Sequence, residues 1–322
     1  MSEEILRVNN VSRIYETSGG GFGRKNKVSA LDGVSFNLVQ GETLGIVGES
    51  GCGKSTLGRI ISRLDTPTTG EIIYKGNDIA KKSLAAMRPL RKEIQFIFQD
   101  PYASLNPRHT VGTIVSTPFK INKVMPEGGV KKRVQEILEI VGLNPEHYNR
   151  YPHEFSGGQR QRIGIARALA LRPKLIVADE PVSALDVSIQ AQIINLMKDL
   201  QKDFGLTFVF IAHDLAVVRH FAQRVAVMYL GNIVEIADRD TLYAAPKHPY
   251  TKALLSAVPE ADPDATGARE RIRLTGDVPN PINPPSGCRF RTRCWKAAEI
   301  CATQAPALLQ IGKTQVACHF PE

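Results

Sequence analysis

No stretch of this 322-residue chain is long and apolar enough to span a lipid bilayer. A transmembrane helix needs about 18–20 consecutive apolar residues, and every apolar run here is shorter. The N-terminal segment MSEEILRVNN also has neither the basic region nor the apolar region of a secretory signal. These absences predict a protein that is made and kept in the cytoplasm.

Signatures of nucleic-acid-binding proteins are lacking too, although the formal net charge is +9. The basic residues are scattered, and the longest clusters, at 24–27 and 131–133, are short and contain no aromatic side chain. No groove-reading or RNA-reading module is recognisable. We therefore expect no nucleic-acid partner, and the positive charge also suits an acidic ligand or an anionic membrane surface.

Short apolar runs alternate with amphipathic segments along most of the chain, which predicts an α/β core with a mainly parallel sheet. The predicted buried strands are ETLGIVG, IQFIFQD, KLIVADE, TFVFIAH and RVAVMYL. The first 40 residues indicate instead a hairpin of strands around the glycine-rich, basic loop SGGGFGRKNK. No internal repeat is evident, so one core domain is expected and not a tandem pair.

Two further regions differ in composition. Residues from about 100 to 160 contain several prolines, a polar loop and the amphipathic run VKKRVQEILEIVGL, which predict a mostly helical insert. After about residue 256 the chain is proline-rich and aperiodic, and DVPNPINPPSGC cannot form a regular helix or a central strand. We expect a main domain over 1–255 and a small C-terminal extension over 256–322.

The segment GESGCGKS, which spans 48–55, matches the phosphate-loop pattern GxxxxGK(S/T) and lies between a predicted strand and a predicted helix. Glycines let successive backbone N–H groups point at anionic oxygens, and the helix N-terminus adds positive potential. Lys54 should reach the β- and γ-phosphates, while Ser55 should ligate Mg²⁺. The nucleotide-binding residues predicted here are Gly48, Ser50, Gly51, Gly53, Lys54, Ser55 and Thr56.

Two carboxylates end the apolar run KLIVADE. We expect Asp179 to hold Mg²⁺ through water, and Glu180 to polarise the attacking water as a general base. Acidic residues commonly end strands, so this pair is informative mainly because it follows a phosphate loop. The sequence therefore predicts that the chain binds a nucleoside triphosphate with Mg²⁺ and hydrolyses it.

Between these two segments, Phe155-Ser156-Gly157-Gly158-Gln159 resembles the LSGGQ signature of ABC ATPases, with Phe in the leading position. The resemblance covers residues from about 5 to 255. It implies an ABC-type P-loop NTPase: a RecA-like core, an antiparallel β subdomain and a helical subdomain. It also implies that Ser156, Gly157, Gly158 and Gln159 face the γ-phosphate held by another subunit in a head-to-tail dimer.

Single residues resemble further elements of the same family. Tyr15 resembles the aromatic residue that stacks on adenine, although Tyr is also common in strands. Gln99 resembles the glutamine that contacts Mg²⁺ and the attacking water, and His213 the histidine that bonds the γ-phosphate. SALD, ending at Asp186, resembles the D-loop. The resemblance thus implies Glu180, His213 and Gln99 as catalytic residues, Asp186 in the nucleotide site, and Ser55, Gln99 and Asp179 around Mg²⁺.

Three longer segments, QDPYASLNPR, HPYTKALLSAVP and NPPSGCRFRTRC, look like those of dipeptide and oligopeptide importers. This resemblance implies a peripheral ATPase subunit that powers peptide import at the cytoplasmic face of the cytoplasmic membrane. The implied partners are a second, related ATPase in a heterodimer, two transmembrane permease subunits and an extracytoplasmic peptide-binding protein. The alternatives are an ATPase subunit of the same kind in an importer of nickel or glutathione, and a soluble ABC ATPase without a transport role.

Four of the five cysteines, Cys288, Cys294, Cys301 and Cys318, lie close together near the C-terminus. In a reducing compartment such a cluster favours a metal site over disulfides, and four thiolates suit zinc or an iron–sulfur cluster. The absence of a CxxC pair favours the larger cluster, and the resemblance to peptide importers implies 4Fe–4S. Zinc and no metal stay open as alternatives, and His319 could replace one thiolate.

Overall fold

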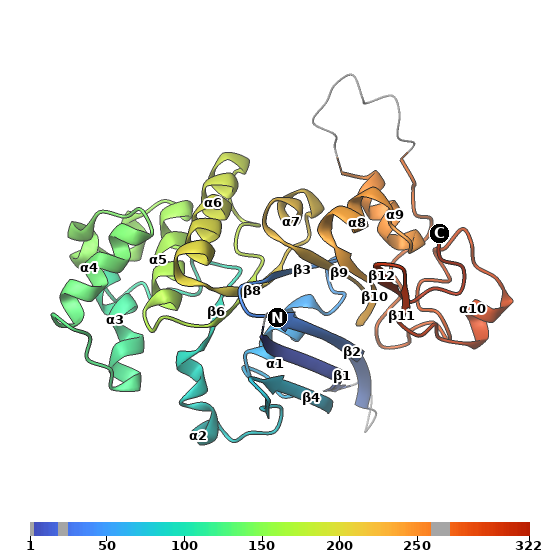
Figure 1. Cartoon of the computed structure of the whole chain (residues 1–322), viewed down its shortest axis with the longest axis horizontal. Helices are drawn as coiled ribbons and strands as arrows, with labels where there is room; N and C mark the ends of the chain where they lie inside the picture. The colour runs from blue at the N-terminus through green and yellow to red at the C-terminus, as the bar shows by residue number, and fades with distance from the viewer. Residues whose placement is uncertain (1–2, 19–24, 259–270) are drawn as a thin grey trace.

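The computed structural model describes residues 3–18, 25–258 and 271–322. Most of the glycine-rich loop expected between the first two strands, and part of the linker expected after residue 256, lie outside the described residues. Figure 1 shows two sheets at the centre and a group of helices on one side. Residues 271–322, called the C-terminal segment below, lie on the other side. The predicted α/β class with a separate antiparallel sheet is confirmed.

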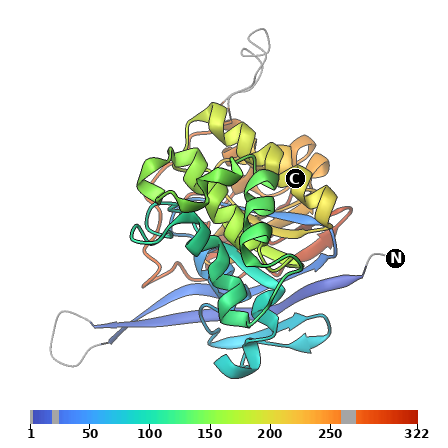
Figure 2. The ribbon, with the colours of Figure 1, turned by 90° about the vertical axis from the view of Figure 1, so that its left-hand side faces the viewer.

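The antiparallel sheet has the strand order β2-β1-β4-β5. Strand β1 (Glu4–Ser18) pairs with β2 (Lys25–Val39) from Glu4↔Val39 to Ser18↔Lys25, so the hairpin expected from the sequence is present. Val34, Phe36 and Leu38 alternate along β2 and are buried, because every second side chain of a strand points to the same face. Strands β4 (Thr69–Tyr74) and β5 (Asn77–Asp78) complete the sheet. In Figure 2 the β1–β2 hairpin extends beyond the rest of the molecule.

The main sheet has the strand order β11-β12-β10-β9-β3-β8-β7-β6. Its parallel part comprises β6 (Ile94–Ile97), β7 (Leu175–Asp179), β8 (Thr207–Ile211), β3 (Thr43–Val47) and β9 (Arg224–Tyr229). Every residue of β3, β7 and β8 is buried, as expected for parallel strands covered on both faces. The carboxyl ends of these strands share one edge, so the loops after β3 and β7 are brought together.

Helices α1 (Lys54–Ile61) and α7 (Leu215–Phe221) pack against the parallel strands. The predicted helical insert contains α3 (Val111–Asn122), α4 (Val130–Ile140) and the start of α5 (Gly157–Leu169), which contact one another. Among the described residues no helix is both long and apolar enough to cross a membrane. The remaining helical elements are α2 (Leu84–Met87), η1 (Leu90–Lys92), η2 (Pro145–Asn149), η3 (Pro152–Glu154), α6 (Val187–Phe204), α8 (Arg239–Ala244), α9 (Pro249–Ser256) and α10 (Glu299–Thr303).

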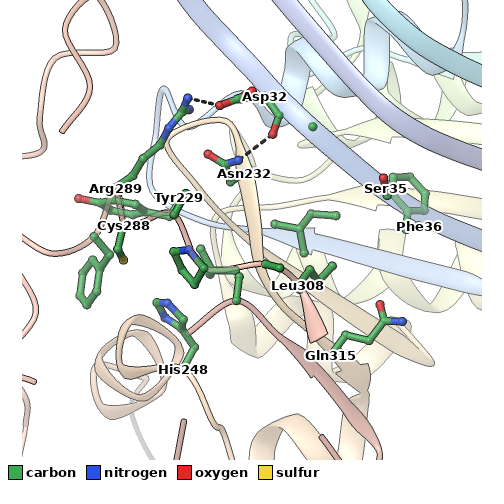
Figure 3. Close-up of a pocket in the computed structure, with 18 of the residues that line it drawn as sticks. Asp32, Ser35, Phe36, Tyr229, Asn232, His248, Cys288, Arg289, Leu308 and Gln315 are labelled. Atoms are coloured by element: carbon green, nitrogen blue, oxygen red, sulfur yellow. Dashed lines mark hydrogen bonds and ion pairs between the residues drawn. The ribbon is translucent and has the colours of Figure 1, made fainter. Parts of the chain in front are cut away.

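The C-terminal segment joins the main sheet. Strand β12 (Thr314–Val316) pairs antiparallel with β10 (Asn232–Asp238), and β11 (Leu309–Ile311) pairs with β12. The Phe290 ring is 1% exposed, with its centroid 5.2 Å from that of Tyr229. A cavity of about 880 Å³ lies between β2, β10 and this segment (Figure 3). The segment is therefore joined to the main sheet and its core through a strand pairing and apolar contacts that the sequence alone does not reveal.

Candidate nucleotide-hydrolysis site

The predicted phosphate loop connects β3 to α1. At Gly48 the backbone φ is 152°, and a Cβ atom there would lie 2.2 Å from the carbonyl oxygen of Met228. Only glycine fits so close to a neighbouring strand. The loop is thus pressed against β9 while its N–H groups lead into the N-terminus of α1, which is the arrangement an anion site requires.

Lys54 closes this loop on itself. Its side chain is 4% exposed, and its ammonium donates to the carbonyl oxygens of Gly48, at 2.7 Å, and of Glu49, at 3.0 Å. A buried ammonium needs acceptors on several sides, and the loop carbonyls supply two. The Lys54 charge therefore lies within the loop, where a phosphate oxygen can replace these acceptors.

Ser55 and Asp179 meet across the site. The Ser55 hydroxyl donates to the Asp179 carboxylate at 2.9 Å, from the start of α1 to the end of β7. Burial raises the pKa of Asp179, and the bond from Ser55 partly offsets this effect. An oxygen pair of a hydroxyl and a buried carboxylate fits Mg²⁺, a hard cation that prefers oxygen ligands.

Glu180, Gln99 and His213 converge beside that pair. The Glu180 carboxylate accepts from the Gln99 amide at 3.0 Å and lies 3.3 Å from Nδ1 of His213. Glu180 is also one of the non-glycine residues with a positive φ, 44°, a conformation that costs free energy and is common at functional sites. Residues from three loops thus meet around one carboxylate that is 15% exposed.

Ser156 and its neighbours form a separate site at the start of α5. The Ser156 hydroxyl accepts from the N–H of Gln159 at 3.3 Å, and the Gln159 side chain accepts from the N–H of Ser156 at 3.1 Å, which is a capping box. A Cβ atom on Gly158 would lie 2.5 Å from Cγ2 of Ile189, so this glycine lets α5 approach α6 closely. The polar contacts of Ser156 are within its own helix and not with the phosphate loop.

The other predicted residues lie at the edges of these groups. The Tyr15 hydroxyl donates to Asp65 at 2.6 Å, and Arg13 lies 4.5 Å from the centre of the Tyr15 ring. Asp186 is exposed and begins α6. Ser50, Gly51, Gly53 and Thr56 belong to the phosphate loop or the first turn of α1. The roles expected for these residues stay predictions.

One contact of the phosphate loop could not be predicted from the sequence. Glu49, inside the loop, pairs with Arg293 of the C-terminal segment through two bonds of 2.7 and 3.1 Å. The N–H of Glu49 donates to the Tyr250 hydroxyl at 2.9 Å. Arg293 and Glu49 are 244 positions apart, and no periodicity links them. The only signal in the sequence was that HPY and GCRFRTRC are segments shared with peptide importers.

The iron–sulfur prediction for Cys288, Cys294, Cys301 and Cys318 is wrong. Across residues 3–18, 25–258 and 271–322, no group of three or more His, Cys, Asp or Glu side chains is placed to hold a metal ion. Burial raises the pKa of Cys288 to about 11 and also raises those of Cys294 and Cys318. Burial thus favours the neutral thiol at these three positions.

The cysteines have a packing role instead. Cys288 and Cys294 pack against the main apolar core, and the N–H of Cys288 donates to the carbonyl of Cys301 at 2.8 Å. All five cysteines are free thiols. The same finding removes the zinc alternative for this segment, because the expected tetrahedral group is not formed by the described side chains.

Comparisons with known proteins agree with this geometry. The family described as "ABC transporter" matches residues 31–183, and "Oligopeptide/dipeptide transporter, C-terminal region" matches residues 234–301. The chain is 55% identical over 321 residues to the oligopeptide transport ATP-binding protein AppF of Bacillus subtilis (strain 168), covering 99% of this chain and 98% of that protein. It is 50% identical over 318 residues to the dipeptide transport ATP-binding protein DppF of Escherichia coli (strain K12), with 99% and 95% covered.

Among solved structures, the ATP-binding cassette MJ0796, a dimer in a post-hydrolysis state bound to ADP and phosphate, is similar with a TM-score of 0.65. The identity is 32%, and the match covers 73% of this chain and 99% of that one. ATP and Mg²⁺ are the species that ABC ATPases bind, and the Ser55–Asp179 pair and the phosphate loop fit them. The chain belongs to the ABC transporter family, as an ATPase of the oligopeptide and dipeptide transport ATP-binding type.

Proposed function

We propose that this ATPase powers the import of dipeptides or oligopeptides through an ABC transporter. The observation that carries the proposal is the cluster of Glu180, Gln99 and His213 at the end of β7, next to a phosphate loop, in a chain whose relatives are named for peptide transport. Nickel or glutathione transport, and a role outside transport, are not favoured by those relatives.

The phosphate loop would bind the triphosphate. Its glycines expose the N–H groups, and Lys54 exchanges the loop carbonyls for β- and γ-phosphate oxygens. Thr56, in the first turn of α1, donates to a phosphate oxygen, and Tyr15 stacks on the adenine after its ring is freed from Arg13. The remaining loop residues in this role are Gly48, Ser50, Gly51, Gly53 and Ser55.

Mg²⁺ would be held by Ser55, by Asp179 through water and by Gln99, and it supplies positive charge at the phosphate oxygens. The existing Ser55–Asp179 bond already positions both ligands. A carboxylate in this role must be ionised, and the bond from Ser55 opposes the rise in the Asp179 pKa that burial causes.

Hydrolysis needs a base beside the γ-phosphate, and we assign that role to Glu180. Its carboxylate accepts a proton from the water whose oxygen bonds to the γ-phosphorus, while the bond from that phosphorus to the ADP oxygen breaks. Gln99 and His213 hold the carboxylate from two sides and can align the same water. The positive φ of Glu180 supports this role, because strained backbone conformations are concentrated at functional sites.

A second ATPase would complete the site. Ser156, Gly157, Gly158 and Gln159 begin a helix whose N-terminus suits an anion, and their polar contacts leave that end exposed. They would face the γ-phosphate on the partner, and Asp186 would lie at the same interface. The dimeric state of the similar cassette supports a pair, and a related but distinct ATPase is the partner we favour.

The remaining partners follow from this role. We propose two transmembrane permease subunits and an extracytoplasmic peptide-binding protein, with the ATPase peripheral on the cytoplasmic face of the cytoplasmic membrane. The helical insert at about 100–160 and Gln99 would contact the permeases. The division into a nucleotide domain over 1–255 and an extension over 256–322 belongs to the same proposal.

Isolation of the assembled transporter tests the proposal. Tagged chain should co-purify with two permeases and a related ATPase, and the reconstituted complex should couple ATP hydrolysis to uptake of labelled dipeptides. Uptake of nickel or glutathione but not of peptides would contradict it, and so would purification without any membrane subunit.

A further inference from the structure

Glu49, inside the phosphate loop, has contacts with the C-terminal part of the chain through its side chain and its backbone. Arg293 bonds both of its carboxylate oxygens, the Tyr250 hydroxyl accepts from its N–H, and Lys54 donates to its carbonyl. Arg293 and Tyr250 lie in the C-terminal part of the chain, after the phosphate loop, the helical insert and the two carboxylates at the end of β7. The conformation of the loop therefore depends on a region that has no predicted role in hydrolysis.

Arg293 is itself fixed by its surroundings. Its side chain is 8% exposed, and its guanidinium lies 6.0 Å from the centre of the Tyr229 ring. Phe290, three residues earlier, packs against the rings of Tyr229 and Tyr250, at 5.2 and 5.3 Å. A guanidinium that is little exposed and bonds both oxygens of one carboxylate has little freedom to leave its partner.

Tyr250 is positioned by the HPY segment. His248 accepts from the N–H of Tyr250 at 3.0 Å and caps α9, and Pro249 occupies the first helical turn. The buried Glu235 accepts from the N–H groups of Lys247 and His248, at 2.7 and 2.9 Å, which fixes the chain before the helix. The Tyr250 hydroxyl is thus directed at the Glu49 N–H by a rigid turn.

The negative charge of Glu49 gives a reason for its pairing with Arg293. A carboxylate on a loop that binds a triphosphate repels its ligand, because like charges a few ångströms apart interact unfavourably. The Glu49 side chain is 27% exposed, so water alone reduces this repulsion only in part. The guanidinium of Arg293 bonds both oxygens of this carboxylate and balances its negative charge.

We propose that Arg293 is a positioning residue for nucleotide binding: it neutralises and orients Glu49, so that the phosphate loop accepts the triphosphate. The C-terminal segment thereby determines ATP affinity without touching the nucleotide. This inference rests on the proposed function, because it takes the 48–55 loop as the nucleotide site.

Steady-state ATPase assays on the assembled transporter test it. Arg293→Gln should raise the KM for ATP by about three- to tenfold with kcat within about twofold, since an interaction equal in ground and transition states changes KM alone. Arg293→Lys should restore part of the affinity. In the double variant Arg293→Gln with Glu49→Gln, the repulsion is gone, and the KM should return to within about twofold of the original value.

Arg289→Gln is the matched control. Arg289 is another arginine of the C-terminal segment, and it pairs with Asp32 (Figure 3) and with the carbonyl of Leu230. Its bonds go to these two residues and not to residues of the phosphate loop. Loosening of the segment in general would raise the KM equally in Arg289→Gln and Arg293→Gln, and that result would overturn the proposal. An unchanged KM in Arg293→Gln, or a double variant as weak as the single one, would overturn it as well.

The proposed function fails in a different way. If Lys54→Ala kept full ATP affinity, the loop would not be the nucleotide site at all. If Lys54→Ala lost ATP binding while Arg293→Gln kept it, only the role of Arg293 would be refuted. Circular dichroism and melting curves of each full-length variant separate these outcomes from a failure to fold.

Discussion

At the scale of single residues, Glu180 is the centre of the site. It combines a positive φ with two side-chain partners from different loops, Gln99 and His213. A residue in this conformation persists only when its surroundings hold it. The strained backbone and the converging side chains point to the same carboxylate.

Glu180→Gln should reduce kcat for ATP by about 100- to 10,000-fold, because the amide cannot accept the proton of the attacking water. ATP affinity should remain, since the phosphate loop is untouched, and ATP should accumulate in a closed dimer. Single-turnover kinetics and size-exclusion chromatography with ATP measure both effects. Hydrolysis at the original rate would show that another group is the base.

His248 predicts a pH dependence of stability. It is 1% exposed, and burial lowers its pKa to about 3, whereas an unfolded histidine titrates near 6.5. Below about pH 6.5 the unfolded state binds a proton that the folded state does not. Stability is therefore retained above that pH and lost as the pH falls towards 3, by up to about 1.4 kcal/mol per pH unit.

His248→Asn keeps an acceptor for the cap and removes the titration. The free energy of unfolding, measured in urea between pH 7 and pH 5, should fall less steeply in this variant than in the parent protein. His220→Gln, at an exposed position near the end of α7, serves as the control and should leave the slope unchanged. Equal slopes in His248→Asn and the parent would contradict the prediction.

At the scale of elements, the approach of α5 to α6 places the signature residues. Gly158 lies in the first turn of α5, where any Cβ atom would meet Ile189 of α6. The Ser156–Gln159 capping box then fixes the first turn of α5. Close packing and capping together fix the position of residues 156–159.

Gly158→Ala should lower the free energy of unfolding by about 1–3 kcal/mol, because overpacking forces the two helices apart. Gly164→Ala on the same helix is the matched control, since an added Cβ atom there meets nothing within 4 Å. That control should be neutral or stabilising by up to about 1 kcal/mol, from helix propensity. Urea unfolding of both variants measures the difference, and equal changes would refute the packing argument.

At the scale of the whole molecule, the C-terminal segment and the nucleotide core form one packed unit. Strand β12 extends the main sheet, Phe290 enters the apolar core, and Arg293 reaches the phosphate loop. A substitution that destabilises the segment should therefore lower the free energy of unfolding of the whole protein and not of the segment alone.

Phe290→Ala should cost about 3–5 kcal/mol of stability, as expected for removal of a fully buried aromatic ring. The core and the segment should unfold in one transition, with the same midpoint by tryptophan fluorescence of Trp295 and by far-ultraviolet circular dichroism. Phe320→Ala, at a residue 40% exposed, should have little effect. A separate early fluorescence transition in the parent protein would contradict the single unit.

Local pattern alone determined much of this protein. Apolar runs and glycine spacing specify the parallel strands and the loop at 48–55, because buried strands and anion-binding loops need those residues in that order. The convergence of Gln99, Glu180 and His213 could be expected only through family resemblance, since each residue follows a different strand.

Only the tertiary structure decided how the C-terminal segment is used. The cysteine spacing suggested a metal cluster, yet burial and packing leave these side chains without a metal-binding arrangement. The bond from Arg293 to Glu49 joins residues 244 positions apart. It forms because the β10–β12 pairing and the packing of Phe290 against Tyr250 bring the C-terminal segment next to the phosphate loop. Contacts of that kind depend on packing in three dimensions, which neither periodicity nor motif spacing encodes.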